Sequence, residues 1–389
     1  MSGNFATPPE FPTCAGPEGI LFDFNYGARV YLPEGKWHVI LLDDDSGNVL
    51  FSCDSDGGWV ASTKKYYVRF RIQVFHQGET HPVLDETLDM KDKPVVIFFP
   101  TGTLGDMLGW FHYAERFRQL HRCHLECVMG QEIIDLLSAQ YPEITFSTKA
   151  SLRTVNPYAS WYVGLFFKGD TLHQPVDFRK VGFHRNAGYI LGVDPRECPP
   201  RLKLDAERKI AEPYVCIAAQ STNQAKYWNN GHGWAEVVVH LKSLGYRVLC
   251  IDRQARHGQG FVWNHIPYGA EDFTGDIPLQ ERVDLLRHAS FFIGLGSGLS
   301  WLAWAAGIPV VLISGFSLPN SEFHTPWRVF SSHGCNGCWD DTSVDFDHQD
   351  FLWCPHHRDT PRQYECTRLI TGRQVTGVVD RLHAGLVDN

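Results

Sequence analysis

Residues 291–315, FFIGLGSGLSWLAWAAGIPVVLISG, decide the fold of this chain. The segment reads as an apolar strand, a loop containing Gly294, Gly296 and Gly298, an apolar helix, a Gly-Ile-Pro turn and a second strand at 310–313. This is a βαβ unit, and its glycine loop brings backbone N–H groups to the start of a helix, where a phosphate or pyrophosphate binds well. Such a loop also serves merely to join a strand to a helix, so taken alone it leaves both interpretations open.

The chain before this segment repeats the alternation of strands and helices. A buried strand at 214–220 (YVCIAAQ) leads through a loop into a helix at 232–245, a second strand at 246–252 (YRVLCID) and a helix at 278–288. Such alternation predicts right-handed crossovers and a doubly wound parallel sheet, with ligand loops at the carboxyl ends of the strands. Residues 206–332 are therefore expected to form a Rossmann-like domain.

An α/β pattern also fills the middle of the chain, after a change of composition near residue 90. The run PVVIFFP at 94–100 is typical of a fully buried strand, and the glycine loop TGTLGDMLGW at 101–110 opens a helix. Residues 151–212 are mixed in character, and their prolines suggest a linker. We expect a first Rossmann-like domain at 91–205, and two such halves facing one another place a ligand crevice between them.

The N-terminal segment, residues 1–90, differs because short β-rich runs alternate there with turn signals. ARVYL, WHVILL, VLFSC and YYVRFRIQVF are separated by turn sequences such as PEG, DDDSG and DSDGG. Strands of this length and spacing predict a small β-barrel or sandwich, in which nothing looks catalytic. Residues 1 to about 15 are punctuated by proline and glycine and are expected to be poorly ordered.

The composition is that of an ordinary globular protein. The 389 residues carry a net charge of −9, 43% of them are apolar, and no basic stripe is present, which argues against nucleic acid as the main partner. No apolar run is long enough to span a membrane, and Met1 to Gly16 lacks the basic start and the apolar core of a signal peptide. We therefore expect a cytoplasmic protein.

Four of the eleven cysteines are clustered in the last part of the chain. Cys335 and Cys338 form a C-x-x-C within HGCNGCW, and Cys354 and Cys366 follow after fifteen and eleven further residues. Zinc and iron both accept four thiolates tetrahedrally, and a site closed by four ligands leaves no position for substrate. The spacing therefore predicts a structural metal site. The other seven cysteines read as small buried hydrophobic residues in a reducing compartment.

The clustered cysteines define a metal finger at 333–370, followed by a C-terminal helix at 371–389. The finger has too few apolar residues to fold without a metal. Two alternatives stay open: four reduced cysteines on a loop, and a mixed ligand set that includes His333, His356 or His357.

Three polar residues are candidates for chemistry. Lys226 lies in the loop after a strand, where it can neutralise a diphosphate leaving group, although a solvated loop charge is the simpler interpretation. Asp106, in the glycine loop at 101–110, can act as a general base, but a carboxylate in a first helical turn is also a common cap, and the helix dipole lowers its pKa. Asp252 ends a strand at a position that often binds ribose hydroxyls. No Asp-x-Asp follows a strand, so no catalytic divalent ion is expected.

These residues together resemble the ADP-heptose glycosyltransferases. GLGSGLSWLAWAAGIPVVLISG is similar to their strand, glycine loop, helix and Gly-x-Pro strand, and AAQSTNQAKYWNNGHGW is similar to the loop whose lysine meets the donor phosphates. The sequence departs from the lipopolysaccharide enzymes in carrying Leu295-Gly296-Ser297 where they usually have an Asp-Thr pair. The N-terminal β segment, TGTLGDMLGW and the C-x2-C-x15-C-x11-C finger resemble a narrower family, the TibC-type autotransporter heptosyltransferases, over nearly the whole chain.

This resemblance implies a GT-B fold with two facing Rossmann-like halves, Fe³⁺ held structurally by the four cysteines, with zinc as the alternative, and assembly into dodecamers. It implies transfer of heptose from ADP-heptose to serines of an autotransporter adhesin before export, and our hypothesis for this transfer is an inverting displacement. Asp106 matches the family's proposed base and Lys226 its donor-phosphate lysine. The candidate donor-binding residues are Thr103, Gly105, Ser221, Thr222, Asp252, Gly296, Ser297, Gly298 and Leu299.

Two rival functions follow from the same features. One is a GT-B transferase that uses a UDP-sugar, because the glycine loop and the lysine do not select the base. The other is a non-catalytic metal-finger scaffold that holds a secreted client.

Overall fold

The computed structural model describes residues 8–100 and 102–387. The expectations for residues 1–7, for Thr101 in the glycine loop and for the last two residues of the C-terminal helix lie outside these ranges. The chain divides into two compact units, which are described separately. The first unit contains the chain up to Gly102, Trp110–Phe178 and His184–Arg196; the second contains Thr103–Gly109, Arg179–Phe183 and Glu197 onward.

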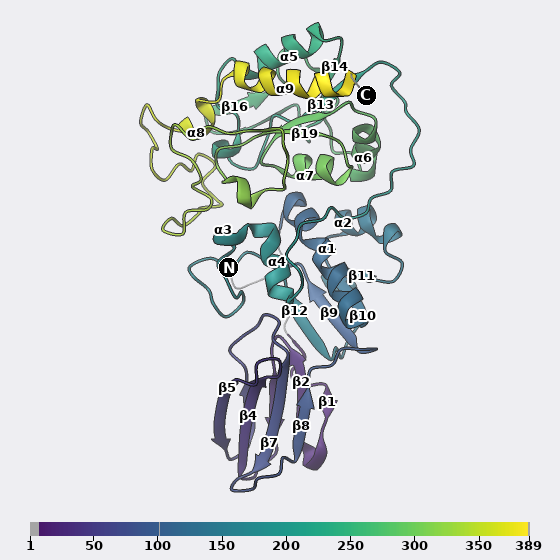
Figure 1. The fold of residues 1–389 in the computed structure, drawn as a ribbon, viewed down its shortest axis with the longest axis vertical. Coiled ribbons are helices and arrows are strands. Elements are labelled where there is room, and N and C mark those ends of the chain that lie inside the picture. The colour runs from purple at the N-terminus through teal and green to yellow at the C-terminus, as the bar shows by residue number, and fades with distance from the viewer. Residues whose placement is uncertain (1–7, 101, 388–389) are drawn as a thin grey trace. The chain divides into compact units, whose positions relative to one another are not determined.

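The first unit contains a long mixed sheet with the strand order β11-β10-β9-β12-β2-β3-β6, and β1 pairs with β2. From β11 to β2 the neighbours are parallel, and β2, β3 and β6 are antiparallel. The strands are β1 (Cys14–Ala15), β2 (Leu21–Asn25), β3 (Arg29–Leu32), β6 (Gly58–Ala61), β9 (Pro94–Phe98), β10 (His124–Val128), β11 (Thr145–Ser147) and β12 (Ala159–Tyr162). The helices nearby in sequence are α1 (Leu104–His121), α2 (Gln131–Leu137), α3 (Phe178–Val181) and α4 (Phe183–Leu191) (Figure 1).

The strands do not divide at residue 90 as the sequence suggested. β2, β3 and β6 join the same sheet as β9, because β12 pairs with β9 on one side and with β2 on the other. The segment 151–212, which read as a linker, supplies this connecting strand. β12 has only four residues, all of them buried, and so short a run shows no periodicity that could reveal it.

The remaining N-terminal strands form a separate antiparallel sheet in the order β5-β4-β7-β8. This order does not close on itself, so the described strands form an open sheet and not a barrel. Alternate residues of the two central strands are fully buried, namely Val39 and Leu41 against Ile72 and Val74, which is the pattern of a half-buried sheet. The strands are β4 (Trp37–Asp43), β5 (Val49–Ser55), β7 (Phe70–His76) and β8 (Leu84–Thr87).

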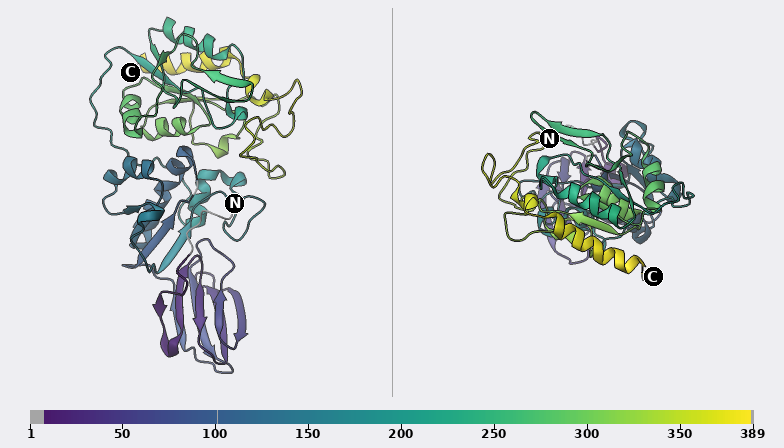
Figure 2. Two further views of the ribbon diagram at one scale, coloured as in Figure 1. Left: turned by 180° about the vertical axis from the view of Figure 1, so that it is seen from behind. Right: turned by 90° about the horizontal axis from the view of Figure 1, so that it is seen from above.

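The second unit is a doubly wound α/β domain. Its sheet has the order β17-β14-β13-β18-β19-β20, and all its strands are parallel. Helices α5 and α9 cover one face of the sheet and α6 and α7 the other (Figures 1 and 2). The elements are β13 (Tyr214–Ile217), α5 (Gly233–Ser243), β14 (Arg247–Cys250), β17 (Glu271–Asp272), α6 (Leu279–Arg287), β18 (Phe292–Leu295), α7 (Gly298–Ala305), β19 (Val310–Ile313), β20 (Arg328–Val329) and α9 (Gly372–Val387).

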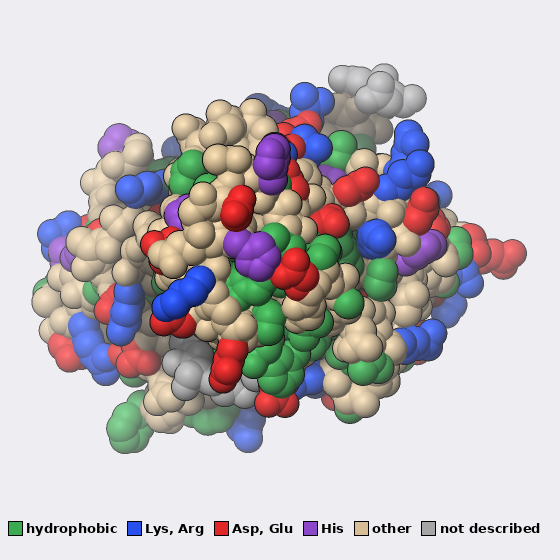
Figure 3. Space-filling model, turned by 90° about the horizontal axis from the view of Figure 1, so that it is seen from below, with side chains coloured by type: hydrophobic (Ala, Val, Ile, Leu, Met, Phe, Trp, Pro, Cys, Tyr) green, Lys and Arg blue, Asp and Glu red, His purple; other side chains and the backbone are tan. Residues whose placement is uncertain are grey.

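A hairpin of β15 (Arg256–Gln259) and β16 (Val262–His265) follows β14. The finger segment contains a single short helix, α8 (Glu365–Arg368), in the described chain. No helix among the described residues is long and apolar enough to cross a membrane. On the face shown in Figure 3, lysine and arginine side chains are scattered among acidic ones.

A partly buried histidine makes the first unit sensitive to acid. The His121 ring packs 4.5 Å from that of Phe117 and 5.3 Å from that of Tyr67, and its Nε2 has no hydrogen-bond partner among the described residues. Burial lowers the pKa of His121 to about 4. In the unfolded chain the His121 side chain takes up a proton near pH 6.5. The contribution of neutral His121 to the free energy of unfolding is therefore fully present above pH 6.5 and is lost as the pH falls toward 4.

We therefore expect His121→Phe to remove part of the acid sensitivity. At pH 5 the neutral histidine costs about 2 kcal/mol of stability relative to pH 7.5, a difference the phenylalanine variant should not show. Melting temperatures of both proteins at the two pH values test this. His81→Gln, a change at an exposed histidine, is the control. Equal acid sensitivity in wild type and His121→Phe would contradict the prediction.

Candidate functional site

The loop between β18 and α7 is the centre of the candidate site. Ser297 adopts an extended conformation (φ −140°) as the N-cap of α7, but its side chain makes no capping hydrogen bond. The hydroxyl oxygen is buried and lacks a hydrogen-bond partner among the described residues. An orphaned hydroxyl at the positive end of a helix is suited to a polar or anionic ligand. The loop residues Gly296, Ser297, Gly298 and Leu299 are all partly exposed.

The glycines assigned to donor binding have packing roles in the structure. A Cβ on Gly105 would lie 2.9 Å from Cδ1 of Trp301, and one on Gly298 would lie 2.9 Å from Cβ of Leu104. A Cβ on Gly296 would lie 2.2 Å from a carboxylate oxygen of Glu322. The sequence interpretation placed a ligand against these glycines. In the structure they let the first turns of α1 and α7 approach each other, and the first turn of α7 is partly covered.

Asp106 lies in the first turn of α1, in the second unit. One carboxylate oxygen accepts hydrogen bonds from the Thr103 amide (2.6 Å) and hydroxyl (3.0 Å), so the capping interpretation holds. The expected fall in pKa is wrong, however. Burial raises the pKa of Asp106, although the Thr103 hydrogen bonds and the Lys226 charge oppose the shift. A desolvated carboxylate with a raised pKa is a stronger base than a solvated cap.

Lys226 ends a short 3-10 helix, η4 (Gln224–Lys226), after β13. Burial lowers its pKa, while the negative charges of Asp106 and Glu322 oppose the shift. The ammonium lies 5.5 Å from the ring centre of Phe316 and 5.6 Å from that of Trp339. The fold thus brings the predicted base and the predicted phosphate lysine into electrostatic range within one unit.

Asp252 is buried at the carboxyl end of β14, where the sequence suggested a contact with ribose hydroxyls. It is 2% exposed, and its two carboxylate oxygens accept hydrogen bonds from the backbone amides of Ala219 (2.8 Å) and Gln220 (3.2 Å). Burial raises the pKa of Asp252 to about 6. The carboxylate holds the loop after β13, and its burial leaves little surface for the ribose contact that its position suggested.

The other predicted donor residues lie in the segment before α1 and in the loop after β13. Thr103 and Thr222 are exposed and Ser221 is partly exposed, so their side chains are accessible. The Thr103 hydroxyl donates a hydrogen bond to Asp106 and so helps to orient the carboxylate of the candidate base.

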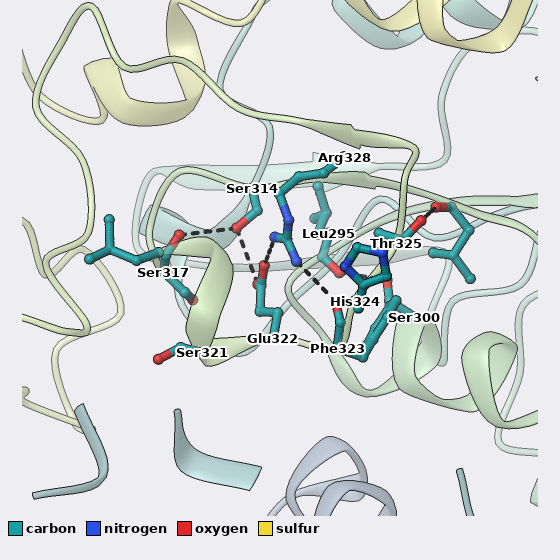
Figure 4. A network of polar contacts seen from close by, with 12 residues as sticks. Leu295, Ser300, Ser314, Ser317, Ser321, Glu322, Phe323, His324, Thr325 and Arg328 are labelled. Atoms are coloured by element: carbon teal, nitrogen blue, oxygen red, sulfur yellow. Dashed lines mark hydrogen bonds and ion pairs between the residues drawn. The ribbon is translucent and has the colours of Figure 1, made fainter. Parts of the chain in front are cut away.

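Glu322 is a site residue that sequence reasoning missed. It is 3% exposed, accepts a hydrogen bond from the Ser314 hydroxyl (3.1 Å) and pairs with the Arg328 guanidinium (Figure 4). Its carboxylate faces Gly296 and lies in electrostatic range of Lys226. Ser314 and Arg328 are near Glu322 in the sequence, but its position beside Gly296 and Lys226 is not indicated locally, because those two residues come from other loops.

His348 is a second residue that the sequence did not reveal. Its ring lies 4.6 Å from that of Phe346 in an edge-to-face arrangement. Burial lowers the pKa of His348, helped by the Lys226 charge and opposed by Asp106. The finger segment therefore reaches the surroundings of both candidate catalytic residues.

The four clustered cysteines line a single cavity. The cavity is lined by His357 and by Cys335, Cys338, Cys354 and Cys366. These four cysteines are free thiols, as are the other seven. The Cys335 amide donates to a carboxylate oxygen of Glu365 (2.7 Å), which orders the turn of the C-x-x-C. Among the described residues no group of three or more potential ligands is arranged to hold a metal as it stands. The donor set fits a four-thiolate site whose ligands would close around an ion.

Comparison with protein families defines the class of protein to which these features belong. Residues 193–341 match the model of glycosyltransferase family 9 (heptosyltransferase), which covers most of the second unit. Residues 16–78 match the model of the N-terminal domain of glycosyltransferase TibC.

Three curated relatives narrow the class. The chain is 74% identical over 384 residues to the autotransporter heptosyltransferase TibC of Escherichia coli O78:H11, covering 99% of this chain and 95% of the relative. It is 74% identical over 383 residues to BAHTCr of Citrobacter rodentium, with coverage of 98% and 94%. An inactive relative, BimC of Burkholderia thailandensis, is 44% identical over 377 residues, with coverage of 96% and 88%. The chain belongs to the autotransporter heptosyltransferases, which confirms the family and the enzyme class predicted from the sequence.

Solved structures agree with this assignment. The dodecameric, iron-containing heptosyltransferase TibC in complex with ADP-D-β-D-heptose superimposes with a TM-score of 0.97 at 75% identity, covering 98% of this chain and all of that one. Lipopolysaccharide heptosyltransferase II of E. coli has a TM-score of 0.53 at 14% identity, covering 76% and 99%, and shares the fold alone. The GT-B-like α/β class is thereby confirmed.

Proposed function

We propose that this heptosyltransferase moves heptose from ADP-heptose to serine hydroxyls of an autotransporter adhesin, with Asp106 as the general base. The observation that carries the assignment of roles is the placement of Asp106 and Lys226 in electrostatic range of each other. The orphaned Ser297 hydroxyl at the start of α7 marks the adjacent anion position. The donor is taken from the complex of the TibC relative.

The reaction is an inverting displacement. Asp106 accepts the proton of the acceptor serine, the serine oxygen attacks the anomeric carbon, and the bond from that carbon to the diphosphate oxygen breaks. The departing ADP carries the negative charge toward Lys226 and the amides at 296–299. This charge is neutralised by the lysine and the helix terminus, so the scheme needs no catalytic divalent ion.

The donor-binding residues of this scheme follow the geometry. Ser221 and Thr222, in the loop after β13, are accessible and can donate hydroxyl hydrogen bonds, whereas the accessible Thr103 hydroxyl, which donates to Asp106, can accept one. Ser297 and Leu299 line the helix terminus, and Gly105, Gly296 and Gly298 allow its close approach to α1. Asp252 acts indirectly, by holding the loop that leads to Lys226.

The finger at 333–370 binds one structural iron through Cys335, Cys338, Cys354 and Cys366 in this proposal. The iron content of TibC supports iron over zinc. A ferric four-thiolate site is coloured and a zinc site is colourless, so elemental analysis and the visible spectrum of the purified protein distinguish them. The dodecameric state of TibC suggests the same assembly here, which light scattering tests. We place the reaction in the cytoplasm, before export of the adhesin, as the family resemblance implies.

One experiment tests the function as a whole. The purified protein is incubated with ADP-heptose and a serine-rich passenger, and the passenger is then weighed by mass spectrometry. Increments of one heptose on serine support the proposal. An unmodified passenger would contradict it and favour a scaffold that holds its client. Competition by UDP stronger than that by ADP would instead favour a UDP-sugar donor.

Lys226→Ala is expected to weaken ADP binding about 10- to 100-fold and to slow turnover. The reason is that a charge-assisted hydrogen bond to phosphate is lost. Titration calorimetry with ADP measures the first effect and initial rates the second. Lys242→Ala, at an exposed position of α5 in the same unit, is the matched control. Unchanged ADP affinity in Lys226→Ala would remove the lysine from the donor site.

A further inference from the structure

The first residues of the loop that carries Lys226 are hydrogen-bonded to the finger. The Asn223 side-chain amide donates to the Asp350 carbonyl (2.8 Å), and the Gln224 backbone amide donates to the Phe351 carbonyl (2.9 Å). Asn223 also caps η4 by accepting from the Ala225 amide at 2.8 Å. The turn that sets the direction of the Lys226 side chain is therefore built on the finger.

The end of the same loop is tied to the last part of the finger. The Asn229 side chain donates to the Thr367 hydroxyl (2.9 Å) and to the Tyr227 carbonyl (2.8 Å). The indole of Trp228 donates to the Ile370 carbonyl at 2.8 Å. Finger segments thus hold the loop before and after the lysine.

The ammonium of Lys226 rests on two aromatic rings, and one of them belongs to the finger. Trp339 follows Cys338 directly, and its backbone amide donates to the Phe316 carbonyl at 3.1 Å, which fixes the two rings relative to each other. Phe346 packs against both rings at centroid distances of 5.3 and 5.7 Å. The lysine is therefore seated on a packed aromatic cluster.

A cation–π contact leaves the ammonium of Lys226 able to bind a ligand, whereas an ion pair would occupy its N–H groups. The π-face attracts the positive charge without accepting the N–H groups in directional hydrogen bonds. Within the described chain, Nζ of Lys226 makes no hydrogen bond and no close ion pair, so its three donors can point to an anion. Fixing the side chain in advance lowers the entropy lost when a phosphate binds.

Ala225, the residue before Lys226, contacts both the aromatic cluster under the ammonium and the cavity lined by the cysteines. Ala225 is 4% exposed and lines the cavity together with the four cysteines, Phe316 and Trp353. It packs in one apolar cluster with Phe316 and Trp353. The backbone that carries Lys226 is thus in contact with the core of the finger.

We infer that the finger is part of the donor site, with Trp339 as a positioning residue that holds the ammonium of Lys226 where the diphosphate binds. This inference rests on the proposed function of Lys226 and extends it, because it gives the cysteine-rich segment a role in donor affinity besides its structural one.

The test is a double-mutant cycle read out by ADP affinity. Trp339→Leu is expected to weaken ADP binding about 3- to 30-fold, because the π-face is lost, whereas Trp339→Phe retains most of the affinity. In a Lys226→Ala background, Trp339→Leu should have no further effect on ADP affinity. Titration calorimetry supplies the dissociation constants, and melting temperature and metal content show whether the finger is intact.

Trp263→Leu is the matched control, because Trp263 is an exposed tryptophan on β16 of the same unit and lies outside the aromatic cluster; its ADP affinity should stay near that of wild type. Wild-type affinity in Trp339→Leu, or an equal loss with and without Lys226, would overturn the inference while leaving the role of Lys226 intact. Unchanged affinity in Lys226→Ala alone would overturn both. If Trp339→Leu fails to fold, the same cycle with Trp339→Met decides, because methionine also fills the aromatic cluster and lacks a π-face.

Discussion

Asp106→Asn is expected to lower the rate of heptose transfer by about 10²- to 10⁴-fold while ADP binding is largely retained. The asparagine keeps a carbonyl oxygen that can accept the Thr103 hydrogen bonds, so the cap of α1 is preserved. What is lost is the ability to take a proton from the acceptor serine. The substitution therefore separates the two roles of this carboxylate, which Asp106→Ala would remove together.

Initial rates with ADP-heptose and a passenger, together with ADP titrations, measure this result. Glu281→Gln is the control, because Glu281 is also a carboxylate in a first helical turn of the second unit but is exposed on α6. It should leave the rate unchanged. Wild-type turnover in Asp106→Asn would show that Asp106 only caps the helix.

The pH dependence supplies a second signature of the base. Because burial raises the pKa of Asp106, the carboxylate is protonated, and inactive as a base, up to a pH above its ordinary value of 3.8. Activity should therefore rise with pH through this pKa and fall as the solution is acidified. The residual activity of Asp106→Asn should lack this acid limb. An acid limb that persists unchanged in the variant would assign it to another group.

Cys366→Ser is expected to have the largest effect on stability. Cys366 is 7% exposed and lines the cavity with the other three cysteines, so its loss leaves the proposed metal site one ligand short. Because a structural metal contributes its binding energy to folding, we expect reduced metal content and a melting temperature lower by about 5–15 °C. Elemental analysis, the visible spectrum and calorimetric melting measure these effects.

Cys198→Ser is the control for the loss of a thiol, because Cys198 is exposed and lies outside the finger. It should leave metal content and melting temperature unchanged. The finger variant should also bind ADP less tightly, since the loop at 223–230 is hydrogen-bonded to the finger. Full metal content in Cys366→Ser would contradict the four-cysteine ligand set.

The sequence was most informative where structure depends on local pattern. The strand at 291–295, the loop after it and the helix that follows were legible because apolar runs, glycines and a Gly-Ile-Pro turn lie next to each other in the chain. The same holds for α5 and α6. The motifs around Lys226 and the cysteine spacing carried the family resemblance, which the relatives confirm.

The sequence was least informative where a short element depends on distant partners. β12 escaped notice because four buried residues carry no period, and it exists as a strand because β9 and β2 pair with it on either side. The domain boundary predicted at residue 90 therefore divides strands that belong to one sheet. Glu322 and His348 were missed for a related reason. Each is a site residue because it interacts with the charge of Lys226, which lies far away in the sequence.

By itself the sequence determined the α/β class, the second Rossmann-like domain and the family, because each follows from residues close together in the chain. Only the tertiary structure decided what surrounds each polar group: that Asp106 is both a cap and a desolvated carboxylate, that Asp252 fastens a loop, and that Lys226 rests on Trp339. Desolvation and charge act through space, and for Lys226 they involve Asp106 and Trp339, each more than a hundred positions away, which no local pattern records.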